Sequence, residues 1–295
     1  MRRGRARATA LGLALLSSLP VACKQKQKPP PAVVSIGGES ALLPRAPAPA
    51  TNPAIRATPK KVEVRGKPRD YLLVEPVAPA AGPLPLILVL HGDGGGMQSF
   101  HQAWPFERAT QNGAYLAYLE GLNATWDLET LKDNRDIAFA EAAVNAIAEA
   151  LPIDKSRVFA AGYSSGGFFA NVLACHRPEL LRAIASNAGG APYNQPEKWG
   201  NGYPKCPGQK GVATLALHGE QDFTVTLDSG RFDAEYWAYV NGCNDSEVET
   251  SGYPECRMYR GCPAGKNVGF CTIKTLGHWV WSESAIASWT FFQRQ

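Results

Sequence analysis

Short apolar runs alternate with longer amphipathic stretches from about residue 61 to the C-terminus. Runs such as Leu86–Leu90 and Val212–Leu217 have the length and continuous hydrophobicity of strands buried on both faces. The stretch Arg135–Leu151 instead places its apolar residues at helical spacing, on one stripe. Strands that alternate with helices predict an α/β fold, with a mostly parallel sheet and helices on both faces. Further strands are expected over 114–119, 158–161, 183–186 and 269–275, and an antiparallel pair over 62–64 and 71–74.

The first 23 residues have the architecture of an export signal. Four arginines within residues 2–7 precede an apolar stretch over residues 8–19 and a few small residues before Cys23. The apolar stretch is too short to span a membrane. The sequence Pro20-Val21-Ala22-Cys23 resembles a bacterial lipoprotein cleavage box, so Cys23 is the expected lipid anchor to a membrane. The alternative is a secretory signal that is cut near Ala22 and leaves a freely secreted protein.

Residues 24–60 are predicted to be a disordered tether. They contain eight prolines, few large apolar side chains and no periodicity. Such a segment buries too little surface to offset the entropy lost on ordering. The expected organisation is therefore a signal peptide over 1–23, a Pro-rich tether over 24–60 and one catalytic domain over 61–295.

The charge is distributed unevenly along the 295 residues. The whole chain carries a formal charge of +4, but residues 1–60 hold 10 of the 30 Lys and Arg and one of the 26 acidic residues. Residues 61–295 therefore hold 20 basic and 25 acidic side chains, a net charge of −5. A mildly acidic domain disfavours nucleic acid as a partner, because such binding depends on clustered Lys and Arg.

The pentapeptide Gly162-Tyr163-Ser164-Ser165-Gly166 stands between a predicted strand and a predicted helix. A serine on such a tight turn requires small neighbours two residues to either side, and Gly162 and Gly166 meet that need. The turn would present the Ser164 hydroxyl as a nucleophile and direct the Ser165 N–H at a developing oxyanion.

Asp222 and His278 follow Ser164 in the order nucleophile, acid, base, which is the order of an α/β-hydrolase triad. Asp222 comes shortly after the strand predicted over 212–217, at the sheet edge where active sites of open α/β sheets lie. A serine hydroxyl needs a base within hydrogen-bond reach and an acid that orients the base. The alternatives are a solvated or helix-capping role for Asp222, and a plain surface position for His278.

The second oxyanion donor is expected in the loop His91-Gly92-Asp93-Gly94-Gly95-Gly96. It follows a predicted strand and resembles the glycine-rich loop of esterases, so the N–H of Asp93 or Gly94 is the expected donor. Phosphate binding is the competing interpretation, but no Lys-Ser/Thr follows the glycines as a P-loop requires.

With these motifs, the chain from about Val62 to Gln295 resembles the polyhydroxybutyrate depolymerase, feruloyl esterase and acetylxylan esterase group of secreted α/β-hydrolases. The matching blocks are Arg69–Val74, Leu90–Gly92, Asp136–Phe139, the Ser164 turn, Ala174–Pro178, His218-Gly219 with Asp222, and Gly277–Trp281. Two positions depart from the family pattern, Asp93 and Ser282. The resemblance implies hydrolysis of a carboxylic ester through an acyl-enzyme, on a polysaccharide-linked or polyester substrate, with no metal or organic cofactor.

Six cysteines remain when Cys23 is set aside, an even number in a chain with an export signal. This pattern favours disulfides over metal ligands. The resemblance implies Cys175 paired with Cys206 and Cys243 paired with Cys262, which leaves Cys256 with Cys271. Sequence alone permits an exchange among the last two pairs.

The segment between Gly190 and Val212 is too short for a large helical lid, so we expect an open pocket. Aromatic side chains commonly line ligand pockets, and Trp126, Tyr163 and Trp279 are the candidates for substrate contact. The sequence does not choose among feruloyl, acetyl and hydroxybutyrate esters. Two other functions stay open: a serine peptidase of the same fold, and a non-catalytic anchored binding domain.

Overall fold

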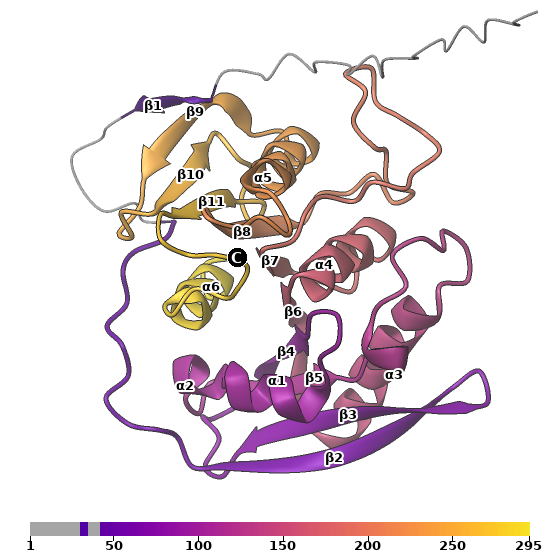
Figure 1. The fold of residues 1–295 in the computed structure, drawn as a ribbon. Coiled ribbons are helices and arrows are strands. Elements are labelled where there is room, and N and C mark those ends of the chain that lie inside the picture. The colour runs from indigo at the N-terminus through magenta and orange to yellow at the C-terminus, as the bar shows by residue number, and fades with distance from the viewer. Residues whose placement is uncertain (1–29, 35–41) are drawn as a thin grey trace, which may run out of the picture. The chain divides into compact units, whose positions relative to one another are not determined.

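A single sheet of eleven strands runs through the residues that the computed structural model describes, 30–34 and 42–295 (Figure 1). The strand order is β1-β9-β10-β11-β8-β7-β6-β4-β5-β3-β2. The strands are β1 (Ala32–Val34), β2 (Ile55–Val64), β3 (Lys67–Pro76), β4 (Leu84–Leu90), β5 (Tyr115–Leu119), β6 (Ile153–Tyr163), β7 (Ala183–Asn187), β8 (Ala213–Gly219), β9 (Asn244–Thr250), β10 (Cys256–Arg260) and β11 (Val268–Ile273). The predicted signal peptide and Cys23 lie outside the described residues.

The six central strands, from β5 to β11, all run parallel to their neighbours. Antiparallel pairs flank them: β2 with β3 on one side, and β9 with β10 on the other. Every strand predicted from the apolar runs is present in this sheet, as is the β2–β3 pair. Strands β9 and β10 were not predicted, because β9 reads Asn-Asp-Ser-Glu-Val-Glu-Thr and lacks an apolar run.

Helices cover both faces of the sheet. They are α1 (Met97–Ala103), α2 (Glu107–Thr110), α3 (Arg135–Ala150), α4 (Ser165–His176), α5 (Leu227–Asn241) and α6 (Ser284–Phe292), and a short 3₁₀ turn spans Leu122–Ala124. Helices α3, α4 and α5 supply side chains to one apolar cluster, and α1, α2 and α6 supply side chains to another. The expectation of an α/β-hydrolase fold with helices on both faces is confirmed.

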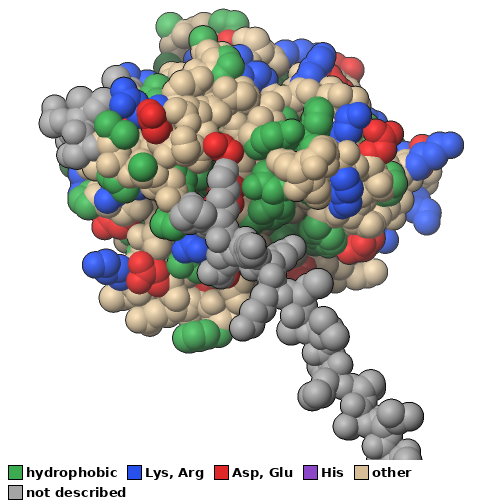
Figure 2. All heavy atoms as spheres, turned by 90° about the horizontal axis from the view of Figure 1, so that it is seen from above, with side chains coloured by type: hydrophobic (Ala, Val, Ile, Leu, Met, Phe, Trp, Pro, Cys, Tyr) green, Lys and Arg blue, Asp and Glu red, His purple; other side chains and the backbone are tan. Residues whose placement is uncertain are grey.

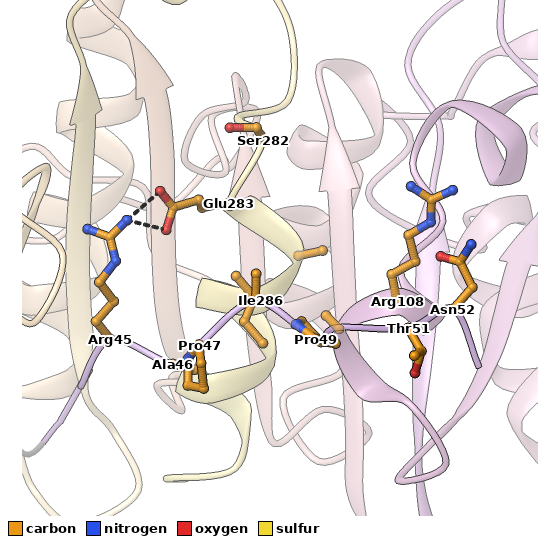
Figure 3. A pocket seen from close by; sticks show the side chains of 13 residues that line it. Arg45, Ala46, Pro47, Pro49, Thr51, Asn52, Arg108, Ser282, Glu283 and Ile286 are labelled. Atoms are coloured by element: carbon orange, nitrogen blue, oxygen red, sulfur yellow. Dashed lines mark hydrogen bonds and ion pairs between the residues drawn. The ribbon is translucent and has the colours of Figure 1, made fainter.

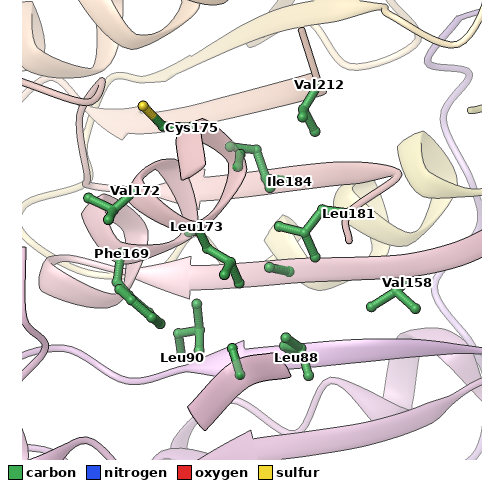
Figure 4. Packing of buried hydrophobic residues seen from close by; sticks show 14 of the residues in the cluster. Leu88, Leu90, Val158, Phe169, Val172, Leu173, Cys175, Leu181, Ile184 and Val212 are labelled. Atoms are coloured by element: carbon green, nitrogen blue, oxygen red, sulfur yellow. The ribbon is translucent and has the colours of Figure 1, made fainter. Parts of the chain in front are cut away.

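The core beneath the serine turn is formed by β4, β6 and α4 (Figure 4). Leu88, Leu90 and Val158 of the strands pack with Phe169 and Leu173 of α4, and each is fully or almost fully buried. This packing fixes the angle at which α4 leaves β6. The position of Ser164, at the junction of these two elements, is therefore set by the core.

The structure corrects the predicted tether. Strand β2 begins at Ile55, six residues before the predicted domain boundary, and pairs with β3 along its whole length. Upstream of β2, Leu43 is completely buried and Arg45 forms an ion pair with Glu283 of the α6 N-terminus. Residues 42–54, called the N-terminal arm below, thus belong to the folded unit. Strand β1, also within the predicted tether, pairs with β9.

The six cysteines form the three disulfides that the family resemblance implied: Cys175–Cys206, Cys243–Cys262 and Cys256–Cys271. The first ties the end of α4 to the segment between β7 and β8. This segment, residues 188–212, contains no helix, as expected for a site without a helical lid. No helix in the described part of the chain is long and apolar enough to cross a membrane.

Candidate active site

Ser164 occupies a sharp turn between β6 and α4, with φ +53° and ψ −122°. A side-chain-bearing residue adopts this conformation only when its surroundings enforce it. Two glycines make the turn possible. A Cβ on Gly162 would lie 2.1 Å from the Gly166 carbonyl oxygen, and one on Gly166 would lie 2.3 Å from the Leu90 carbonyl oxygen. The backbone therefore passes too close at both positions for any other residue.

Ser164, His278 and Asp222 form a continuous hydrogen-bonded chain. Ser164 Oγ lies 2.9 Å from His278 Nε2, and His278 Nδ1 lies 2.7 Å from Asp222 Oδ2. Asp222 is buried, whereas Ser164 and His278 remain partly accessible. The three side chains come from separate loops, which the sheet brings to the same edge.

Backbone groups hold the Asp222 carboxylate in place. Its Oδ1 accepts hydrogen bonds from the N–H groups of Thr224 and Val225, both at 2.9 Å. This leaves Oδ2 to face His278. The arrangement suits a carboxylate that orients an imidazole.

A second histidine contacts the same carboxylate. His218 Nε2 lies 2.8 Å from the Val225 carbonyl oxygen and 3.3 Å from Asp222 Oδ2. A carbonyl oxygen only accepts, so Nε2 carries the proton. Burial lowers the pKa of His218, which favours the neutral ring. The sequence did not assign a role to His218, although His218-Gly219 stood among the blocks of the family resemblance.

Two backbone N–H groups next to Ser164 in the sequence or in the loop after β4 are the candidates for stabilising an oxyanion. The Ser165 N–H belongs to the first turn of α4 and has no carbonyl partner within the helix. In the loop after β4, the prediction of Gly94 as a donor is wrong, because its N–H donates to the Ala124 carbonyl oxygen at 2.8 Å. Asp93 remains as the loop candidate, and its side chain is held aside by a 2.6 Å hydrogen bond from Thr125 Oγ1.

His91 fixes the shape of this loop. Its Nε2 accepts the Gly121 N–H at 2.9 Å, so its Nδ1 carries the proton and donates to the Gly92 carbonyl oxygen at 2.8 Å. The His91 carbonyl oxygen in turn accepts from the Trp126 indole N–H at 2.7 Å. Trp126 is 4% exposed and stacks on Phe169. The predicted substrate contact of Trp126 is therefore wrong: the indole is part of the core that supports the loop.

Tyr163 and Trp279 do line a cavity beside Ser164. The cavity has a volume of about 280 Å³ and is bounded on its other sides by the His91–Gly95 loop and by Phe100. The Tyr163 hydroxyl donates to the His278 carbonyl oxygen at 2.8 Å. Burial and the nearby Asp222 charge raise the pKa of Tyr163 to about 12, so this donor keeps its proton. Trp279 is 45% exposed and packs edge-on against Tyr163.

In the described part of the chain, no three His, Cys, Asp or Glu side chains are arranged so that they could hold a metal ion. Lys, Arg, Asp and Glu side chains are intermixed over the face seen in Figure 2, and no broad basic patch stands out there.

Comparison with known proteins places the chain among esterases. It is 31% identical over 207 residues to "Probable feruloyl esterase C" from Aspergillus niger. The aligned region covers 66% of this chain and 71% of that protein. It is 25% identical over 215 residues to "Feruloyl esterase B" from Piromyces equi. The aligned region covers 66% of this chain but only 39% of that relative. The chain thus spans well under half the length of the Piromyces protein. No family model matches the chain.

A solved structure has the same fold. The acetyl xylan esterase from Aspergillus awamori superposes with a TM-score of 0.63 over 80% of this chain and 99% of that protein. The sequence identity is 18%, so the likeness extends to the fold alone.

Proposed function

Because the chain belongs to the feruloyl esterase family of α/β-hydrolases, we propose that it hydrolyses carboxylic esters with Ser164, His278 and Asp222 as its catalytic triad. The observation that carries the proposal is the unbroken hydrogen-bonded chain from Ser164 Oγ through both nitrogens of His278 to Asp222 Oδ2. Each group in it has the partner that nucleophilic catalysis by a serine requires.

The reaction has two halves. Ser164 Oγ attacks the ester carbonyl carbon while its proton passes to His278 Nε2, and Asp222 stabilises the resulting imidazolium through Nδ1. The imidazolium then protonates the leaving alcohol, and an acyl-enzyme on Ser164 remains. In the second half, His278 takes a proton from water, the water oxygen attacks the acyl carbon, and the acid is released as Ser164 regains its proton.

The negative charge on the carbonyl oxygen develops in both halves and needs preorganised donors. The Ser165 N–H at the start of α4 is the first proposed donor, and the Asp93 N–H is the second. The side chain of Asp93 is turned toward Thr125, which keeps the carboxylate from competing for the position of the oxyanion.

The proposed substrates are feruloyl or acetyl esters that are linked to a polysaccharide. Relatives named feruloyl esterase support the acyl group, and the cavity beside Ser164 has aromatic walls in Tyr163, Phe100 and Trp279 that suit an aromatic acid. Neither relative is a polyhydroxybutyrate depolymerase, so that part of the resemblance stays a prediction.

We further propose that the protein is exported. The charged, apolar and small-residue regions of the first 23 residues support a signal peptide, and three disulfides suit an oxidising compartment. Anchoring through acylated Cys23 remains part of this proposal. Mass spectrometry of the mature N-terminus would distinguish a diacylglyceryl Cys23 from a free amino terminus.

The test is hydrolysis of p-nitrophenyl acetate, p-nitrophenyl butyrate, methyl ferulate and acetylated xylan by the mature chain. A peptide p-nitroanilide series and the Ser164→Ala variant are assayed in parallel. The proposal expects turnover of the esters, a preference for ferulate or acetylated xylan, and loss of turnover in the variant. Cleavage of the anilides alone would favour a peptidase. A folded protein that turns over neither class would favour a binding domain.

A further inference from the structure

Three neighbouring cavities lie beside the candidate active site. The first is the 280 Å³ cavity next to Ser164, and it shares Ala103 and Trp279 with a second cavity of about 570 Å³. The second shares Arg108, Ser282 and Ala285 with a third cavity of about 800 Å³. The shared wall residues place the three cavities in a row, called the groove below, which leads from Ser164 between the α1–α2 region and the segment before α6.

The groove is far larger than one ester group requires. A single small ligand occupies a cleft of roughly 300–1,000 Å³, and the first cavity alone, at about 280 Å³, comes close to the lower end of that range. The second and third cavities extend well past the reacting bond. The length of the groove beyond the first cavity suits a polymeric substrate that continues past the ester bond.

The walls past the first cavity combine an aromatic face with polar groups. Trp279 stands at the first junction with almost half of its surface exposed. Arg108 stands at the second junction, exposed, and within the described part of the chain its guanidinium makes no ion pair. Ser282 and Asn52 add hydroxyl and amide groups. Exposed aromatic rings stack on sugar rings, and such donors pair with sugar hydroxyls.

The N-terminal arm forms the far end of the groove (Figure 3). Arg45 pairs with Glu283 at one end of the arm, and both carboxylate oxygens of Glu283 lie within 2.9 Å of the guanidinium. The arm crosses α6 near Ile286, and Asn52 lies beside Arg108 at the other end. The arm is thereby fixed against the domain and completes the third cavity.

We propose that this groove binds the polysaccharide chain that carries the ester, with Trp279 against the sugar nearest Ser164 and Arg108 donating hydrogen bonds to hydroxyls further along. The inference rests on the proposed esterase function and extends it, because it assigns the binding of the polymer to residues outside the triad. It also gives the N-terminal arm a part in substrate binding.

The test compares kcat/KM on methyl ferulate with kcat/KM on feruloylated arabinoxylan oligosaccharides of increasing length. In the wild-type protein kcat/KM should rise with length until the groove is filled. Arg108→Gln should lower kcat/KM on the longer oligosaccharides by about tenfold, the factor that corresponds to one hydrogen bond to a charged group. Its turnover of methyl ferulate should stay within twofold of wild type. Arg56→Gln, an exposed arginine on β2 outside the groove, is the matched control and should change neither value.

A second variant tests the groove independently, in case the Arg108→Gln substitution changes kcat/KM only slightly. Ala285→Trp places a bulky ring where the second and third cavities meet, and should abolish the dependence on length while methyl ferulate is still hydrolysed. Equal losses on both substrates, or no dependence on length in the wild type, would overturn the groove and leave the esterase function standing. Failure of the wild type to hydrolyse methyl ferulate or any other ester would instead overturn the proposed function itself.

Discussion

His218 Nε2 lies 3.3 Å from Asp222 Oδ2, the same oxygen that faces His278. The His218 ring is almost completely buried and also binds the Val225 carbonyl oxygen, which belongs to the loop that wraps around the carboxylate. Helix α5 approaches this ring so closely that a Cβ on Gly230 would lie 2.3 Å from Nδ1. His218 thus links Asp222 to α5, and we assign it as a positioning residue.

Replacing His218 should lower kcat and leave KM nearly unchanged. His218→Phe removes the Nε2–H, so the loop and the carboxylate lose about 1.4 kcal/mol of hydrogen bonding, which corresponds to a tenfold lower kcat. His218→Gln places an amide N–H near the same position and should recover part of the rate. Steady-state kinetics on p-nitrophenyl acetate measures both. A merely structural role would instead lower the melting temperature of both variants with kcat unchanged in the folded fraction.

Asp233 should make the stability of the protein depend on pH. It is buried on α5, and desolvation raises its pKa from 3.8 to about 7 despite the hydrogen bond that Asn171 donates to its Oδ2. The folded protein therefore holds this proton more tightly than the unfolded chain does. The stabilisation is complete below about pH 4 and is lost as the pH rises through about 7.

Asp233→Asn removes the ionisable group with little change in shape. The variant should match the wild type in melting temperature near pH 4 and exceed it at pH 8. Differential scanning calorimetry at the two pH values measures the difference. A constant gap between the two proteins across this range would show that Asp233 does not titrate there.

The conformation of Ser164 should cost the fold some stability. Its positive φ is strained for a residue with a side chain, by about 1–3 kcal/mol. Ser164→Gly relieves the strain and Ser164→Ala does not, so the glycine variant should have the higher free energy of unfolding by about 1–2 kcal/mol. Both variants lack the nucleophile and should be inactive. Urea denaturation of the two proteins makes the comparison, and equal midpoints would argue against strain at this turn.

Leu43 should contribute to stability as a core residue although it stands in a Pro-rich segment. Its side chain is completely buried in the same cluster as Tyr253 and Phe291. Leu43→Ala should lower the free energy of unfolding by about 2–5 kcal/mol. Val33→Ala, at a side chain that is 59% exposed, should change it by less than about 0.5 kcal/mol. Similar effects of the two substitutions would mean that the arm is not part of the core.

The sequence predicted the features that local pattern determines. Strand β6, the two glycines and Ser164 are contiguous, so the turn could be identified from one stretch of residues. Asp222 and His278 were predicted as partners of Ser164 because the order of the three residues along the chain is itself a signal. Their convergence in space then followed from the parallel sheet, whose strand ends meet at one edge.

The predictions for Gly94, Trp126 and the arm were wrong because contacts with segments distant in the sequence determine these local structures. The Gly94 N–H is occupied by the Ala124 carbonyl oxygen, which lies thirty residues further along the chain. Trp126 is drawn inward by the His91 carbonyl oxygen and by Phe169. The arm looked disordered because Pro and Ala dominate its composition, and nothing local reveals the cavity that Leu43 fills. His218 was overlooked because the sequence analysis assigned a role to Asp222 alone in the block that contains both residues.

Strands β1 and β2 are the two outermost strands of the sheet, although only residues 35–54 separate them in the sequence. One short N-terminal segment therefore supplies both edge strands, which cover β9 on one side and β3 on the other. An uncovered edge strand offers unpaired N–H and C=O groups to a second molecule. Proteolysis before residue 61 would remove β1 and more than half of β2, so the nicked protein would be prone to self-association through both ends of its sheet.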